Sequence, residues 1–166
     1  MANRIVEDPR VDPRIKALFA DTPQMRGAKL GSREEVLAGL AAMAAQSTGE
    51  SFISVLAKQD FEAIVPSNGL DISKHEVRSD PDGNTISLQV IRPQSDDPLP
   101  CVYYIHGGGM VMLSAYDANY SAWGRMIAHG GVAVVMVEFR NALVPNTLPE
   151  VAIYPGGLND CVSGLR

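Results

Sequence analysis

Cysteine is scarce in this sequence, and long apolar runs are missing from it. Only Cys101 and Cys161 occur among the 166 residues, in segments whose patterns predict a strand and a helix. Two reduced thiols in the core of a cytoplasmic protein are therefore favoured over a disulfide. No apolar stretch approaches the roughly 20 residues that a membrane span needs. The charged start, MANRIVEDPR, also lacks the apolar centre of a signal peptide.

Positive charge and metal-ligand spacing are also lacking. The net charge is −5 at pH 7, which argues against nucleic acid or an anionic membrane as the main partner. The histidines, His75, His106 and His129, are scattered, and neither they nor the cysteines have a spacing typical of metal sites. We therefore expect no metal and no cofactor.

The composition is ordinary for a globular protein, with 46% hydrophobic and 20% charged residues. Residues 1–68 have a helical pattern. Asp12-Pro13 predicts the start of a short helix, and Ser32 followed by Glu35 has the form of a capping box, which marks a second helix start. Apolar residues behind that box repeat at helical spacing: Val36, Leu37, Leu40, Met43 and Ala44.

From about Ile72 the pattern changes to that of strands. Segments 72–78 and 85–91 flank the turn-forming residues 80–84, so they predict an antiparallel pair. Apolar and polar residues alternate in the second segment, which predicts a strand covered on one face.

Two nearly continuous apolar runs, 101–105 and 132–139, predict strands buried on both faces, as at the parallel centre of an α/β sheet. Between them, residues 117–129 have helical spacing and are followed by two glycines. Another helix begins near Pro155. We therefore expect an α/β fold in residues 69–166, with antiparallel first strands and then a parallel β-α-β unit whose crossover is right-handed.

The segment YYIHGGGM, residues 103–110, places a histidine and three glycines directly after the first buried run. It contains neither the Gly-Lys-Ser/Thr of a P-loop nor the glycine spacing of a dinucleotide site. Two interpretations remain. One is a structural turn, and the other is a loop whose backbone N–H groups stabilise a developing oxyanion, where glycine lets an acyl group come close. The second is favoured because ligands of open α/β sheets bind at such strand ends.

This segment, with VAVVMVEFRNAL about thirty residues later and then YPGGLNDC, resembles the hormone-sensitive-lipase-like family of α/β-hydrolase carboxylesterases. Its His-Gly-Gly-Gly motif is an oxyanion-hole element of lipases and esterases. The resemblance implies that Gly108 and Gly109 supply the oxyanion N–H groups and that Gly107 lets the loop turn. It also implies that His106 braces the loop by hydrogen bonding and is not the catalytic base.

The resemblance covers Ile72 to the end and, more weakly, the N-terminal part. It implies that residues 1–68 form a helical cap segment over the acyl pocket. Residues 139–142, FRNA, stand where many members have Tyr-Arg-Leu-Ala. Asp160 is expected to be a solvated or helix-bracing carboxylate, because the catalytic acid of this family comes later in the chain.

The catalytic triad of this family is missing from the sequence. No serine has glycines two residues before and two after it, the Gly-x-Ser-x-Gly elbow of the nucleophile, and His129 precedes any nucleophile. The sequence also ends inside a helical pattern. We therefore expect the N-terminal chain of a serine carboxylesterase for short acyl esters, inactive alone and completed by a C-terminal chain. A homo-oligomer is left open.

Three alternatives are open at this stage. The first is a non-catalytic small-molecule binder of the same fold, and the second is an acyl hydrolase of amides or lactones. The third is a stand-alone α/β module with a structural glycine loop, which would be folded and monomeric by itself.

Overall fold

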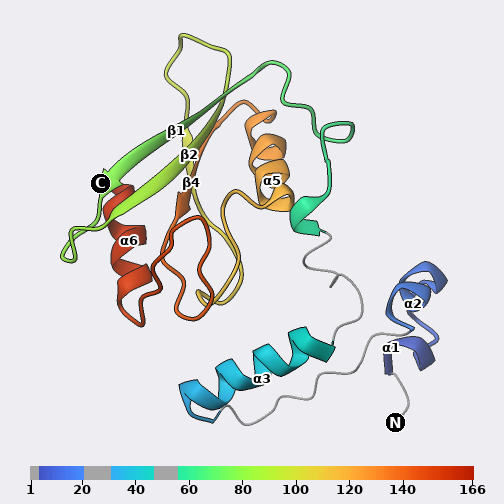
Figure 1. Cartoon of the computed structure of the whole chain (residues 1–166). Coiled ribbons are helices and arrows are strands. Elements are labelled where there is room, and N and C mark those ends of the chain that lie inside the picture. The colour runs from blue at the N-terminus through green and yellow to red at the C-terminus, as the bar shows by residue number, and fades with distance from the viewer. Residues whose placement is uncertain (1–3, 21–30, 47–55) are drawn as a thin grey trace. The chain divides into compact units, whose positions relative to one another are not determined.

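The computed structural model describes residues 4–20, 31–46 and 56–166 (Figure 1). The chain forms two compact units, Met1–Gln46 and Ser47–Arg166, and each is described by itself.

The first unit is helical, with α1 at Arg4–Glu7, α2 at Pro13–Phe19 and α3 at Arg33–Gln46. Asp12 caps α2, since its side chain accepts a hydrogen bond from the Arg14 N–H at 2.8 Å. The capping box of α3 is confirmed: the Ser32 N–H donates to Glu35 Oε2 at 2.8 Å, and the Glu35 N–H donates to Ser32 Oγ at 3.2 Å. The side chains of Leu40, Met43 and Ala44 lie outside the described residues.

The second unit contains a four-stranded sheet in the order β1-β2-β4-β3. β1 and β2 are antiparallel, β2 and β4 are antiparallel, and β3 and β4 are parallel neighbours. The predicted antiparallel start followed by a parallel β-α-β unit is therefore confirmed. The strands are β1 (Leu70–Arg78), β2 (Thr85–Pro93), β3 (Cys101–Ile105) and β4 (Ala133–Glu138).

Helices α5 (Ala118–Ala128) and α6 (Gly156–Leu165) contact β2 and β4 from opposite faces of the sheet (Figure 1). Successive strand residues point to opposite faces, so each helix meets its own set of apolar side chains. On the α5 face Ala128 packs with Val134 and Met136. On the α6 face Cys161 packs with Val137 and Phe139. The core therefore has two layers with the sheet between them.

The prediction that β2 is covered on one face is wrong. Ser87, between two buried apolar residues of the strand, is itself buried. Its hydroxyl accepts a hydrogen bond from Tyr116 Oη at 2.9 Å. A polar residue can be buried here because a side chain from the segment before α5 supplies its partner.

The prediction that the β3 segment is buried on both faces is also wrong. β3 is the outer strand next to β4, and α5 and α6 lie over β2 and β4 instead. Val102 and Ile105 are therefore 37% and 49% exposed. Cys101, expected in the core, is exposed, whereas Cys161 on α6 is buried, and both thiols are free.

The two thiols should consequently react at very different rates with a disulfide reagent at about pH 8. Burial, with the Asp160 charge adding to it, raises the pKa of Cys161 to about 11, and only a thiolate reacts. We expect one thiol per chain to react quickly and the second to react only when the chain unfolds. Cys101→Ser should remove the fast phase and Cys161→Ser should leave it intact. Equal rates in both variants would contradict the burial of Cys161.

Candidate functional site

Residues 106–114, here called the glycine loop, leave β3 at its carboxyl end. Because β3 and β4 are parallel, the segment that follows β4 emerges beside the glycine loop. Backbone hydrogen bonds join the two segments: the Ala142 N–H donates to Met110 O at 2.9 Å, and the Val144 N–H donates to Val111 O at 2.9 Å. Strand ends of this kind are where α/β proteins bind ligands.

Glycine is needed most strongly at position 108. Gly108 has φ 112° and Gly109 has φ 63°, both in the region that side chains disfavour. A Cβ added to Gly108 would overlap the carbonyl oxygen of Met112, whereas one on Gly109 would find its nearest neighbour, Val111 Cγ2, at 3.9 Å. A Cβ on Gly107 would come within 2.6 Å of Tyr120 Oη. Position 108 is therefore restricted by both conformation and space.

The N–H groups of Gly108 and Gly109 are candidate contacts for a ligand. Among the residues that the structure describes, no acceptor is found for either N–H. An unpaired N–H can bind an oxygen of a ligand. Their role as oxyanion donors stays a prediction.

His106, the first residue of the glycine loop, is buried. Its ring stacks on that of Phe139, with centroids 4.3 Å apart and planes 10° apart, and its Nδ1 lies 2.8 Å from Gly107 O. A carbonyl oxygen can only accept, so Nδ1 carries the proton. Burial lowers the pKa of His106, although the bond to Gly107 O and the Glu138 and Asp117 charges oppose this effect. A buried, neutral ring that stacks on an aromatic side chain is suited to holding the loop in place.

Of the two expectations for Asp160, the solvated carboxylate is wrong, because the residue is fully buried, and the helix-bracing carboxylate is confirmed by its contacts. It accepts hydrogen bonds from the Arg140 N–H at 3.0 Å and from Arg140 Nε at 2.8 Å. Arg140 also pairs with Asp82 at 2.7 Å. Burial alone would raise the pKa of Asp160, but its hydrogen bonds from Arg140, Ser79 and Asn84 hold that pKa below its ordinary value. The carboxylate braces α6 against the segment after β4.

His129 lies away from the glycine loop. It is the C-cap residue of α5, and its Nε2 donates to Pro66 O at 2.8 Å. This contact gives the residue a structural partner.

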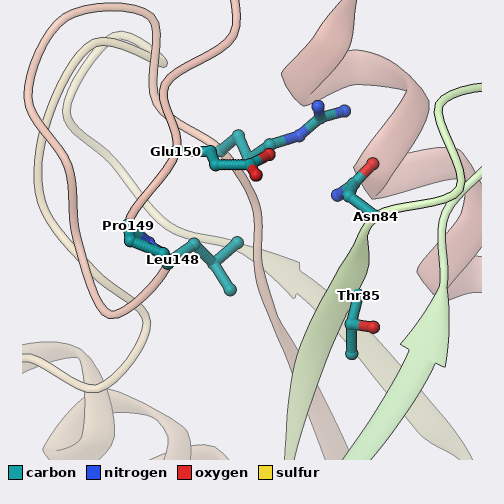
Figure 2. Close-up of a pocket in the computed structure, with 6 residues that line it drawn as sticks. Asn84, Thr85, Leu148, Pro149 and Glu150 are labelled. Atoms are coloured by element: carbon teal, nitrogen blue, oxygen red, sulfur yellow. The ribbon is translucent and has the colours of Figure 1, made fainter.

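A small pocket of about 210 Å³ lies beside the ion pair of Arg140 and Asp160 (Figure 2). Figure 2 places Asn84 and Thr85 across the opening from the segment that carries Leu148 and Glu150. No residue of the glycine loop lines it. Arg140, which does line it, has its charge matched by two carboxylates. The pocket is therefore separate from the glycine site and offers no free cation for an anionic ligand.

The sequence analysis missed two residues that hold the glycine loop. Glu138 and Asn141 are fully buried. Glu138 Oε2 accepts from the Ala115 N–H at 2.7 Å, and Asn141 Nδ2 donates to Leu113 O at 2.8 Å. The only sequence signal was a charged residue ending a continuous apolar run, VAVVMVE.

Searches of the described residues add two negative findings. No three His, Cys, Asp or Glu side chains there are grouped as ligands of a metal ion. No helix within those residues has the length and apolarity to cross a membrane.

The strand order, the helices on the two faces and the glycine loop after β3 define the N-terminal part of an α/β-hydrolase fold. Esterase Est22 superimposes with a TM-score of 0.84 and 56% sequence identity, over 98% of this chain and 47% of that one. Brefeldin A esterase, described as a bacterial homologue of human hormone-sensitive lipase, gives a TM-score of 0.73 and 26% identity over 97% of this chain and 44% of that one. The resemblance to hormone-sensitive-lipase-like esterases is thereby confirmed.

The sequence relatives are also esterases by name. 3-O-acetylpapaveroxine carboxylesterase CXE1 of Papaver somniferum is 29% identical over 110 residues, which are 61% of this chain and 32% of that protein. Gut esterase 1 of Caenorhabditis elegans is 34% identical over 55 residues, 33% of this chain and 10% of that protein. The chain matches none of the protein-family models with which it was compared. It spans about half the length of the solved esterases, and less of the sequence relatives.

Proposed function

We propose that this chain supplies the oxyanion loop of a serine carboxylesterase for short acyl esters. The nucleophile, the acid and the base come from a polypeptide outside these 166 residues. The observation that carries the proposal is the glycine loop at the carboxyl end of β3, where the N–H groups of Gly108 and Gly109 have no acceptor in the described part of the chain. The resemblance of the chain to esterases supports the choice of esters as the substrate class.

The chemistry of the completed site follows from those donors. A serine of the completing polypeptide attacks the acyl carbonyl carbon, and the carbonyl oxygen gains negative charge in the tetrahedral intermediate. The N–H groups of Gly108 and Gly109 donate hydrogen bonds to this oxygen, and Gly107 and His106 keep the loop in place. The base of the completing polypeptide takes the serine proton and gives it to the ester oxygen, the bond between this oxygen and the acyl carbon breaks, and the alcohol leaves. Water then hydrolyses the acyl-enzyme. The chain by itself lacks the nucleophile and is inactive.

Exposed apolar surfaces support the existence of a completing polypeptide. The outer edge of β3 has no neighbouring strand among the described residues. An open edge next to exposed apolar side chains favours pairing with a strand of another polypeptide. On α6, Leu158, Val162 and Leu165 are exposed. In this proposal the completing polypeptide covers both surfaces, and residues 1–68 form a cap segment over the acyl pocket. The two free thiols agree with a reducing, cytoplasmic location.

A chimera tests the proposal. In it this chain replaces the segment of esterase Est22 that it matches at 56% identity. We expect the chimera to hydrolyse a short p-nitrophenyl ester, because the loop presents its N–H groups to the acyl oxygen. A chimera that is folded, by circular dichroism, but no faster than buffer would contradict the proposal.

Two further measurements separate the alternatives. Faster turnover of an anilide or a lactone than of the matched ester by the chimera would favour an amide or lactone hydrolase. Denaturing mass analysis of the protein purified from its native source should reveal a completing polypeptide, joined to this chain or separate from it. If that polypeptide lacks a serine elbow, the non-catalytic binder is favoured. A folded, monomeric species of these 166 residues alone would favour the stand-alone module.

A further inference from the structure

The glycine loop is held in a backbone conformation that it would not adopt by itself. Besides its glycines, Met110 has φ 59° and Leu113 has φ 76°. Side chains disfavour this region by about 1–2 kcal/mol per residue. Such residues persist where surrounding contacts hold them. The contacts that hold this loop should therefore control where its N–H groups lie.

The returning end of the loop is fixed by Glu138, the last residue of β4. The Ser114 hydroxyl lies 2.9 Å and 3.1 Å from the two carboxylate oxygens, and the Ala115 N–H donates to Oε2 at 2.7 Å. On its other side the carboxylate accepts from the Thr147 N–H at 3.1 Å and from Thr147 Oγ1 at 2.8 Å. One buried carboxylate thus joins the glycine loop to the loop after β4.

The next residues of the same segment hold two more points of the loop. The ring of Phe139 stacks on His106, where the loop begins. The side chain of Asn141 donates to Leu113 O at 2.8 Å, and Leu113 is one of the two strained residues. Asn141 stands where the family motif has leucine, which cannot make this bond. Residues 138, 139 and 141 therefore form a clamp on the loop.

A carboxylate suits the clamp better than any neutral side chain of the same shape. Each oxygen of the Glu138 carboxylate meets a backbone N–H, Oε1 that of Thr147 and Oε2 that of Ala115. The side-chain amide that a Glu138→Gln variant carries has only one oxygen. In either orientation its NH₂ group would face one of these backbone donors, and that donor would lose its partner.

We propose that Glu138, assisted by Asn141, is a positioning residue of the oxyanion loop. The effect of Glu138 on catalysis rests on the proposed function. The clamp itself does not, because its effect on the loop can be measured without activity.

Amide hydrogen exchange on the folded Est22 chimera tests the clamp directly. Glu138→Gln should accelerate exchange of the Ala115 N–H or of the Thr147 N–H, whichever donor loses its oxygen, roughly 5- to 10-fold, the factor expected for one lost hydrogen bond. Ser114→Ala, a milder change that keeps the Ala115 contact, should have a smaller effect. The control is Ser163→Ala in α6, which removes a hydroxyl that accepts from the Asp80 N–H at 3.0 Å. It should leave exchange of the glycine loop unchanged.

Unchanged exchange at both Ala115 and Thr147 in Glu138→Gln would overturn the clamp. So would uniformly fast exchange of the glycine loop in the unaltered chimera. Acceleration spread equally over β2 would also overturn it, because it would mean that Glu138 stabilises the whole unit.

The catalytic consequence is tested in the Est22 chimera. Glu138→Gln should lower kcat roughly 10²-fold, as expected for a misplaced reacting group, with little change in KM, because oxyanion donors act in the transition state. Asn141→Leu should lower kcat less. Rates are divided by the concentration of reactive serine, so a mere loss of folded protein would not change kcat. An unchanged kcat would overturn the positioning role. An inactive unaltered chimera would instead count against the proposed function, while the exchange result decides the clamp.

Discussion

Gly108→Ala should lower kcat of the Est22 chimera by at least roughly 10²-fold, the loss that follows removal of one oxyanion donor. The added methyl group would overlap Met112 O, and the φ of 112° is one that alanine disfavours. Since Met112 O belongs to the backbone of the glycine loop itself, the loop must open to accommodate the methyl group. The Gly108 and Gly109 N–H groups would then leave the acyl oxygen. The measurement is the steady-state kinetics of p-nitrophenyl ester hydrolysis.

Gly109→Ala is the matched comparison for this prediction. Alanine keeps the N–H, its Cβ has space, and only the left-handed φ of 63° opposes it. The cost is about 1–2 kcal/mol, and we expect a smaller loss of kcat than for Gly108→Ala. Equal losses in the two variants would mean that close packing at position 108 does not control the loop.

Asp160→Asn should lower the free energy of unfolding of the Est22 chimera by about 3–5 kcal/mol, the range for removing one partner of a buried ion pair. Asp160 is fully buried and Arg140 almost so. The variant leaves the guanidinium with only Asp82, whose side chain is 45% exposed. Urea unfolding of the chimera with and without the substitution measures the difference.

Asp82→Asn is the control, with an expected loss of about 1 kcal/mol or less, because water screens the exposed carboxylate. The pH dependence gives a second check. Because hydrogen bonds hold the folded-state pKa of Asp160 below its ordinary value of 3.8, its stabilising effect is complete above that value. It is lost as the pH falls through the folded-state pKa. The difference between the chimera and its Asp160→Asn variant should therefore shrink only below about pH 3.8. Equal losses for Asp82→Asn and Asp160→Asn would contradict the assigned roles.

Local sequence patterns predicted most of the secondary structure because those elements depend on neighbours along the chain. The Ser32–Glu35 capping box, the antiparallel pair around the turn at 80–84 and the helix at 117–129 all match the structure within a few residues. The glycine loop was also predicted at the end of its strand. The fold class followed from the order of these elements.

Burial was predicted less well, because it depends on which elements lie over a strand. The run at 101–105 is as apolar as that at 132–139, yet β3 is the outer strand and exposes Cys101, whereas β4 is buried between two helices. Ser87 is polar, yet it is buried because Tyr116 reaches it. Periodicity reports on side-chain alternation and not on the neighbours of a strand.

The sequence by itself determined the helices, the strands, the place of the three glycines and the absence of a serine elbow, because each is a local pattern. Only the tertiary structure decided the roles of Asp160, Glu138 and Asn141. Their partners lie in segments far away in the sequence, such as Ser114, 24 residues from Glu138. A buried polar side chain is stable only when such partners meet it, and chain folding alone brings them together.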